Sequence, residues 1–183
     1  ALTAMSEGNQ IVVVSRDHAG FYSKPMLANA LAGNKTAATL VMKPADKMAT
    51  ELNAEVIANT AVQQIDTAAR RVELADGRLL DYRDLVLALG ADPIRLPLQG
   101  DAADAVLSVN DLDDYARFAG RLEGVTRVAI LGAGLIGCEF ANDLAAGGYA
   151  VDIIDIAQQA LGRLLPPEGG AMLKDKLAAL GVL

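Results

Sequence analysis

The stretch Arg127–Asp155, RVAILGAGLIGCEFANDLAAGGYAVDIID, decides the fold of this chain. It begins with a short apolar, β-branched run, passes through a glycine-rich turn, and then carries apolar residues at helical spacing. A pair of glycines stops the helical pattern before a second β-branched run. The pattern predicts a strand over Arg127–Leu131, a helix over Leu135–Ala146 and a strand over Tyr149–Asp155.

The turn between the first strand and the helix reads Gly132-Ala-Gly134-Leu-Ile-Gly137, which is a G-x-G-x-x-G. Gly132 permits the tight turn, Gly134 lets the backbone approach a diphosphate, and Gly137 lets the helix pack close to the strand. The helix begins at Leu135, followed by Ile136, and the free N–H groups of its first turn would face the diphosphate. In this context the motif predicts a dinucleotide-binding α/β unit of the Rossmann type.

An acid closes the second strand of this unit. Asp155 lies 18 residues beyond Gly137, close to the spacing of about 20 that the motif requires. Its carboxylate can accept hydrogen bonds from both hydroxyls of an adenosine ribose and repels a 2′-phosphate. Ile156 and Ala157 supply no cation for such a phosphate, so the pattern favours NADH over NADPH. The alternative is that these glycines form only a tight turn.

The rest of the chain carries further strand and helix signals. A buried strand is expected at Ile11–Ser15, a helix from Pro25, and strands at Thr39–Met42, Glu55–Ala58 and Leu85–Leu89. Between Val62 and Val86 short apolar segments alternate with turns, including Asp76-Gly77, which predicts a small antiparallel meander.

The ends of the helices and of the chain carry weaker signals. Asn110 is expected to cap a helix from Asp111 to about Leu122. A last helix is expected around Ala171–Leu180, with Gly181–Leu183 entering another strand. At the other end, Ala1–Met5 resembles the tail of a helix, and nothing in Ala1–Gln10 has the pattern of a signal peptide.

Composition excludes several classes of protein. The chain of 183 residues has a net charge of −7, which argues against a nucleic-acid partner because a phosphate backbone needs a basic face. It has one cysteine, Cys138, and one histidine, His18, so neither an internal disulfide nor a histidine metal cluster is expected. No apolar run reaches the length of about 18 residues that a membrane helix needs, and a cytoplasmic protein is expected.

Four segments together resemble the FAD-dependent pyridine nucleotide oxidoreductases, and within them the rubredoxin reductase branch. They are Tyr22–Leu27 (YSKPML), Tyr82–Pro93 (YRDLVLALGADP), Asn110–Phe118 (NDLDDYARF) and Gly132–Asp143 (GAGLIGCEFAND). The resemblance implies an α/β, Rossmann-like FAD/NAD(P)-binding fold with incomplete domains. Residues 1–106 would belong to an FAD-binding domain, 107–125 to a linker and connecting helix, and 126–183 to an NADH-binding domain.

The resemblance also implies roles for individual residues. Asp17, with Arg16 beside it, would hold the adenosine ribose of FAD, and Lys24 would approach the FAD phosphates and the flavin. Val62 would meet the adenine through its backbone, and Gly90-Ala91 would let the chain pass close to the cofactor. The resemblance further places Glu139 where flavin and nicotinamide meet.

The implied activity is an oxidoreductase that passes electrons from NADH through FAD to rubredoxin. A ferredoxin reductase or a nitrite reductase-type flavoprotein is the nearest alternative, although Asn29 stands where many ferredoxin-reductase relatives carry a lysine. A non-catalytic nucleotide-binding module is the alternative of another class. Because the first glycine loop of an FAD domain is absent, the chain is not expected to be a competent enzyme alone.

Overall fold

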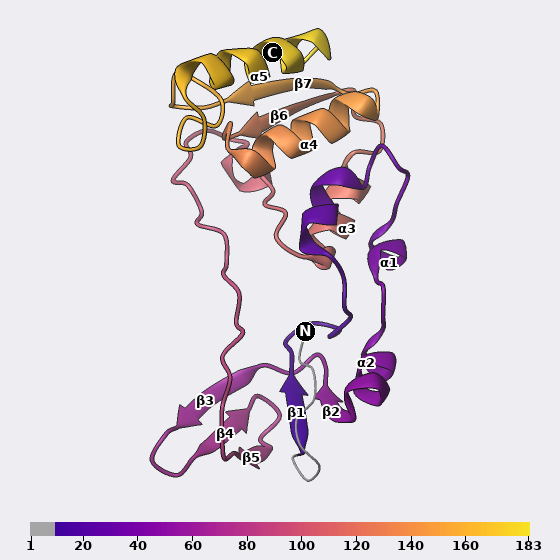
Figure 1. The fold of residues 1–183 in the computed structure, drawn as a ribbon, viewed down its shortest axis with the longest axis vertical. Helices are drawn as coiled ribbons and strands as arrows, with labels where there is room; N and C mark the ends of the chain where they lie inside the picture. Colours follow the sequence, from indigo (N-terminus) through magenta and orange to yellow (C-terminus); the bar gives the residue numbers. More distant parts are fainter. Residues whose placement is uncertain (1–9) are drawn as a thin grey trace. The chain divides into compact units, whose positions relative to one another are not determined.

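The computed structural model describes residues 10–183, which form two compact units. The first unit comprises the described chain up to Tyr22 together with Val41–Ala91, and the second comprises Ser23–Leu40 and Asp92–Leu183. Figure 1 follows the chain through both units. The helix tail expected at Ala1–Met5 lies outside the described residues.

A parallel pair of strands begins the first unit. β1 (Ile11–Val14) pairs with β2 (Ala54–Ile57) in the register that sets Ile11 against Ala54 and Val14 against Ile57. The helix α2 (Ala45–Leu52) leads into β2 and packs on it. This arrangement confirms the strands expected at Ile11–Ser15 and Glu55–Ala58, because short β-branched runs suit a parallel sheet.

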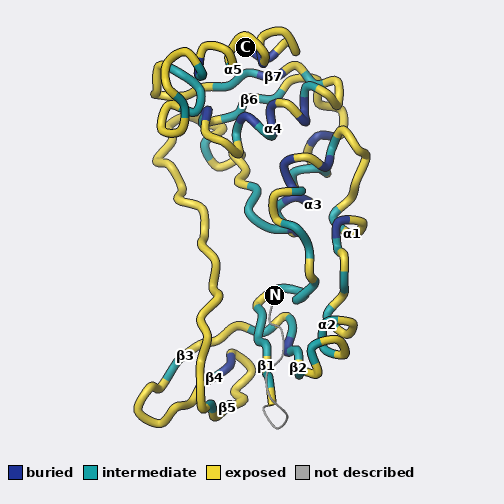
Figure 2. Tube along the Cα trace, in the orientation of Figure 1, coloured by how far each residue is buried: buried dark blue, intermediate teal, exposed yellow. Residues whose placement is uncertain are grey.

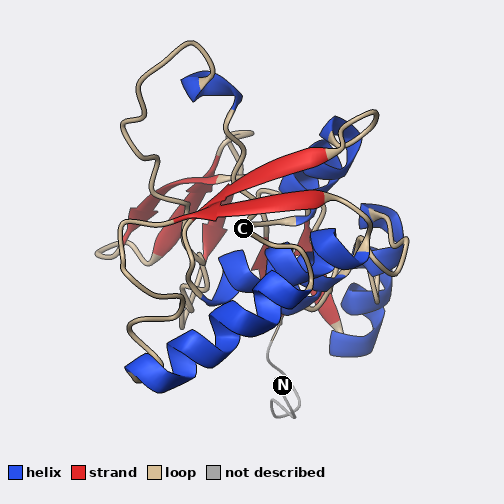
Figure 3. Cartoon of the chain, turned by 90° about the horizontal axis from the view of Figure 1, so that it is seen from above, coloured by secondary structure: helices blue, strands red, loops and turns tan. Residues whose placement is uncertain are grey.

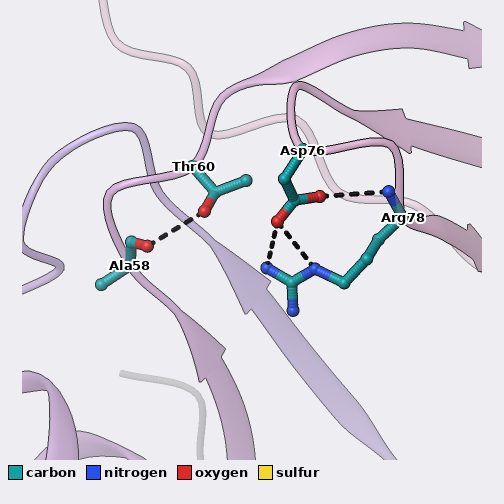
Figure 4. A network of polar contacts seen from close by, with 4 residues as sticks. All are labelled: Ala58, Thr60, Asp76 and Arg78. Atoms are coloured by element: carbon teal, nitrogen blue, oxygen red, sulfur yellow. Dashed lines mark hydrogen bonds and ion pairs between the residues drawn. The ribbon is translucent and has the colours of Figure 1, made fainter.

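The predicted meander is confirmed as a three-stranded antiparallel sheet. It consists of β3 (Val62–Asp66), β4 (Arg71–Leu74) and β5 (Leu79–Asp81), in the order β3-β4-β5. Asp76 and Arg78 form an ion pair at the turn between β4 and β5, with 2.7 Å between the carboxylate and Nη2 (Figure 4). The hairpin signal at Asp76-Gly77 therefore marks the observed turn.

A strand–helix–strand motif forms the centre of the second unit. β6 (Arg127–Leu131) and β7 (Ala150–Ile154) are parallel and in register, and α4 (Leu135–Ala146) connects them. The bounds of β6 and α4 are those that the sequence predicts. The core of this unit is a cluster of buried apolar side chains from the end of α3, from α4 and β7, and from the segments after β7: Leu122, Cys138, Ala141, Leu144, Val151, Leu177 and Val182. Figure 2 colours parts of α4 as buried.

The second unit also contains other helices. They are η1 (Lys24–Asn29), α1 (Ala37–Leu40), η2 (Ala103–Ala105), α3 (Leu112–Arg121) and α5 (Pro167–Ala179). Between β5 and α3 the chain is a long loop interrupted by η2 (Figure 3). Val182 forms a parallel bridge with Val151 of β7, which confirms that a further strand begins at Gly181–Leu183.

The cap of α3 differs from the predicted one. Asp111, and not Asn110, is the N-cap, and its side chain accepts a hydrogen bond from the N–H of Asp114. Asp114 in turn accepts from the N–H of Asn110 at 2.9 Å. Both carboxylates thus accept backbone N–H groups at the N-terminus of α3, an arrangement related to a capping box.

Two predicted strands are wrong. Thr39–Met42 does not form a strand, because Ala37–Leu40 makes a helical turn that the hydroxyls of Thr36 and Thr39 stabilise locally. Leu85–Leu89 is not a strand either, and Val86 is 84% exposed. A buried parallel strand needs a neighbouring strand, and none within the described chain pairs with this segment.

The helix expected from Pro25 is a 3-10 helix, η1, with the proline in its first turn. Among residues 10–183, no helix combines the length and the apolar character that crossing a bilayer requires. The architecture is therefore mixed α/β, with two parallel strand pairs and a small antiparallel sheet.

Candidate functional site

The glycine loop between β6 and α4 has the geometry that its three glycines permit. Gly132 has φ +112°, a region that other residues rarely adopt. A Cβ placed on Gly137 would lie 1.9 Å from the carbonyl oxygen of Gly132, so only glycine allows this approach of helix to strand. A Cβ on Gly134 would meet nothing within 4 Å, which leaves open space beside the start of the helix.

The carboxylate of Asp155 lies against this loop. One oxygen accepts a hydrogen bond from the N–H of Ala133 at 2.5 Å, and the other accepts from the N–H of Ala157 at 2.6 Å. The N–H of Ala157 and then that of Ala133 hold the pKa of Asp155 below its ordinary value. Asp155 is therefore a carboxylate at neutral pH, and it lies at the glycine loop.

The N-terminus of α4 is available to a ligand. Gly134 is its N-cap, no described side chain caps it, and its first turn contains no acidic residue. Leu135 and Ile136 are exposed there, and the first N–H groups of a helix have no partner within the helix. An open, uncapped helix start beside a carboxylate fits the diphosphate and ribose of a dinucleotide. Glu139 follows in the next turn and is half-buried.

A second acid in the first unit adopts the same local turn. Asp17 follows β1 and accepts hydrogen bonds from the Ser15 hydroxyl at 2.6 Å and from the N–H of Ala19 at 2.8 Å. Burial raises the pKa of Asp17, but these two hydrogen bonds, together with smaller electrostatic contributions from His18 and Arg16, lower it overall. Asp155 likewise accepts from the N–H two residues later, so both acids close the same kind of turn after a parallel strand.

The loop after β2 lies beside the loop that carries Asp17. The N–H of Asn59 donates to the carbonyl of Asp17 at 2.7 Å, and the N–H of Thr60 donates to that of Ser15 at 2.9 Å. The Thr60 hydroxyl also donates to the carbonyl of Ala58 (Figure 4). Val62, at the start of β3, follows directly. The structure thus brings Asp17 and the approach to Val62 together at the carboxyl ends of β1 and β2.

The remaining expected residues lie elsewhere. Arg16 is exposed beside Asp17. Gly90, with φ +66°, and Ala91 lie exposed in the extended segment after the meander. Lys24 belongs to the second unit, where its Nζ donates to Oδ1 of Asn110 at 2.7 Å.

The family of the chain follows from comparison with known proteins. The model of the family described as pyridine nucleotide-disulphide oxidoreductase matches residues 1–183. The chain belongs to this family.

Two relatives within the pyridine nucleotide-disulphide oxidoreductases are rubredoxin-NAD(+) reductases. The one from Alcanivorax borkumensis is 46% identical over 172 residues, which are 94% of this chain and 45% of the relative. The one from Acinetobacter baylyi is 40% identical over 179 residues, 95% of this chain and 46% of the relative. The chain therefore spans about half the length of the curated relatives it matches.

Solved structures agree with the fold. NADH:rubredoxin oxidoreductase from Clostridium acetobutylicum is 29% identical, with a TM-score of 0.80 over 94% of this chain and 45% of that one. A ferredoxin reductase from Rhodopseudomonas palustris is 28% identical, with a TM-score of 0.85 over 96% of this chain and 43% of that one. The Rossmann-like fold of this pyridine nucleotide-disulphide oxidoreductase chain is thus shown.

The single cysteine of this family member is a packing residue in the structure. Cys138 is 7% exposed, and its Sγ lies 3.6 Å from the carbonyl oxygen of Ala133. Burial, and then the charge of Asp155, raise the pKa of the Cys138 thiol, so the reactive thiolate is disfavoured. Among residues 10–183, no group of three or more His, Cys, Asp or Glu side chains is placed to hold a metal ion.

Sequence reasoning missed Asp143. It is buried in α4, and its two carboxylate oxygens accept hydrogen bonds from the N–H groups of Leu31 and Ala32. Its neighbours Phe140 and Leu144, three residues before and one after, are both buried. An acid flanked by buried positions at helical spacing is the signal that indicates such a role.

Proposed function

We propose that this chain is part of an FAD-dependent oxidoreductase that takes electrons from NADH and passes them to rubredoxin. The chain spans 45% of its Alcanivorax borkumensis relative, so we propose the activity for a protein that contains this chain and not for these residues alone. The names of the two rubredoxin-NAD(+) reductases support the electron acceptor.

The glycine loop with Asp155 is the observation that carries the NADH part of the proposal. Gly137 must be glycine because a Cβ would collide with the backbone of Gly132, and Gly134 keeps the start of α4 open. Asp155 is ionised and lies bonded to the same loop. We infer that the diphosphate binds at the helix start and that the carboxylate binds the adenosine ribose.

The proposed site residues fall into two groups. For NADH they lie in the second unit: Gly132, Gly134, Leu135, Ile136, Gly137, Glu139 and Asp155. For FAD we propose Arg16, Asp17, Val62, Gly90 and Ala91 in the first unit, and Lys24 in the second. The corresponding domains are residues 1–106 for FAD and 126–183 for NADH, with 107–125 as the connection.

The electron chemistry would reside on the flavin, which accepts a hydride from a nicotinamide and releases electrons singly. The chain's own residues would bind and orient FAD and NADH. Asp155 selects NADH over NADPH because a carboxylate repels a 2′-phosphate, and the exposed Ile156 beside it offers no cation. Lys24 supplies a fixed positive charge for the phosphates of FAD.

Ferredoxin is the second candidate acceptor. The observation that favours it is the likeness to the Rhodopseudomonas palustris ferredoxin reductase, with a TM-score of 0.85 at 28% identity. The rubredoxin reductases are more similar in sequence, at 40–46% identity, and we therefore prefer rubredoxin. We expect the protein to act in the cytoplasm.

The test is a reduction assay on the longer purified protein that contains this chain. We expect bound flavin absorbance that bleaches with NADH at least about tenfold faster than with NADPH. Rubredoxin should then be reduced faster than ferredoxin at equal concentration. A colourless protein that binds NADH would instead identify a non-catalytic nucleotide-binding module. Faster reduction of ferredoxin would mean that ferredoxin is the acceptor, and the proposed roles of FAD and NADH would be unaffected.

A further inference from the structure

Asp143 is the one buried charged or polar residue of the described core, with 4% of its surface exposed. It lies in the last third of α4, the helix whose first turn adjoins the glycine loop. A carboxylate loses its hydration when it is buried, and it persists only where hydrogen-bond donors replace the water. Its surroundings must therefore be built to hold it.

The donors come from a segment more than a hundred residues earlier in the chain. The N–H of Leu31 donates to one carboxylate oxygen at 2.8 Å, and the N–H of Ala32 donates to the other at 3.1 Å. These two N–H groups lie directly after Ala30, the C-cap of η1 (Lys24–Asn29), so one side chain binds two consecutive donors where this turn ends. Hydrogen bonds to a charged acceptor are about twice as strong as neutral ones.

Other contacts hold the same segment on the second unit. Leu27, Ala28 and Ala30 are buried. The Tyr115 hydroxyl donates to the carbonyl of Lys35 at 2.8 Å. At the opposite end of η1, Lys24 binds the side chain of Asn110. Asp143 differs from these contacts because it belongs to the helix that begins at the glycine loop.

We propose that Asp143 is a positioning residue that fixes the Lys24-bearing turn η1 on helix α4. Its carboxylate binds the end of η1, and the buried side chains of Leu27 and Ala28 carry that constraint back toward Lys24. One helix then determines both the C-terminal half of the glycine loop and the position of the Lys24 ammonium. The part of this inference that concerns electron transfer rests on the proposed function.

Three variants of the flavin-containing protein test the anchor. Asp143→Leu removes both acceptors, Asp143→Asn keeps one carbonyl oxygen, and Asn142→Ala changes an exposed neighbour on the same helix. Amide hydrogen exchange across residues 26–35 should be faster by at least about tenfold in Asp143→Leu, intermediate in Asp143→Asn and unchanged in Asn142→Ala. Unchanged exchange in Asp143→Leu would overturn the proposal.

A separate experiment uses the reactivity of Lys24 to report on its position. Acylation of Lys24 by an amine reagent, measured against exposed Lys47 in the same sample, should accelerate a few-fold in Asp143→Leu because the turn is released. An unchanged ratio, with faster exchange at residues 26–35, would show that Asp143 does not place Lys24. Neither measurement requires a working electron acceptor.

The loss of the Asp143 contact should slow flavin reduction without weakening NADH binding. At saturating NADH, flavin reduction should slow about tenfold in Asp143→Leu, whereas the dissociation constant of NADH should stay within about twofold. A parallel loss of NADH binding, with fast exchange along all of α4, would mean a merely structural residue and would overturn the proposal. If the unaltered protein shows no flavin and no NADH reaction, the proposed function fails, and exchange and Lys24 acylation still decide the role of Asp143.

Discussion

One carboxylate oxygen of Asp155, at the end of β7, accepts a hydrogen bond from the N–H of Ala133, in the middle of the glycine loop that follows β6, across 2.5 Å. The carbonyl of Ala133 also accepts from the N–H of Leu161 at 2.8 Å. The loop residue between the first two glycines is thus bonded on both sides. Asp155 therefore shapes the loop as well as offering a charge to a ribose.

Asp155→Ala tests both roles together. We expect the dissociation constant of NADH to rise on the order of tenfold or more, because the ribose loses a charged acceptor and Ala133 loses its partner. The affinity for NADPH should change less, because the repulsion of its 2′-phosphate is also removed. Titration of the NADH and NADPH fluorescence measures both constants.

The control for this variant is Asp152→Asn on the same strand. Asp152 binds exposed Arg127 through both oxygens and lies away from the loop. The Asp152→Asn substitution should leave the dissociation constants of NADH and NADPH unchanged. A tighter preference for NADH in Asp155→Ala would contradict the assigned role of this carboxylate.

The loop should lose its order in acid. Hydrogen bonds from Ala157 and Ala133 lower the pKa of Asp155 below its ordinary value of 3.8. A lowered folded-state pKa means that this carboxylate stabilises the loop above pH 3.8 and stops doing so as pH falls through the lower value. The amide NMR shifts of Ala133 and Ala157 should titrate together with a midpoint below 3.8; a midpoint above it would show that the carboxylate is not bonded in solution.

Two alanine substitutions in the glycine loop should affect different properties, stability in one case and NADH affinity in the other. Gly137→Ala places a Cβ 1.9 Å from the backbone oxygen of Gly132, so it should lower the free energy of unfolding by about 1–3 kcal/mol. Gly134→Ala meets no atom within 4 Å and should unfold like the unaltered protein, yet lose NADH affinity because its methyl group occupies the open space at the helix start.

Urea unfolding and NADH titration of both variants give the comparison. Gly120→Ala is a matched control, since Gly120 is a helical glycine of α3 with nothing within 4 Å of an added Cβ. The Gly120→Ala variant should unfold at the same urea concentration as the unaltered protein or at a slightly higher one, because alanine favours helix. Full NADH affinity in Gly134→Ala would argue against a diphosphate at this place.

The exposed segment Leu85–Leu89 should make the chain of 183 residues bind apolar dyes. Val86, Leu87 and Leu89 are 84%, 60% and 77% exposed, and adjacent apolar side chains in water favour association. We expect the fluorescence of an anilinonaphthalene sulfonate dye to increase with this chain and to fall in Val86→Ser/Leu89→Ser. Equal dye binding by the two chains would contradict this assignment.

The βαβ unit could be predicted almost to the residue because its signals are local. Arg127–Asp155 contains a β-branched run, three glycines that are each required at their position, and a terminal acid. This combination predicts one arrangement, strand–loop–helix–strand. The hairpin at Asp76-Gly77 was similarly specified by its turn residues. The same locality explains why Asp155 could be expected at the loop.

Some of the failures concern residues whose structure depends on distant partners. Leu85–Leu89 has the composition of a buried strand, but the described chain offers it no neighbouring strand. Asp143 binds N–H groups 112 and 111 residues away, a pairing that no periodicity reveals. The cap of α3 was predicted one residue too early: Asp111 stands where Asn110 was expected, because its side chain accepts the N–H of Asp114.

Tyr115 gives the second unit a sensitivity to alkali. It is 0% exposed, and its hydroxyl donates to the carbonyl of Lys35. Burial, and then the negative charge of Asp143, raise the pKa of this phenol above its ordinary 10.0, so the neutral donor stabilises the fold below that pH and the benefit is lost as pH rises through the higher value. In strong base a tyrosinate would face both a carbonyl and a buried carboxylate, and the attachment of residues 23–40 to α3 would weaken.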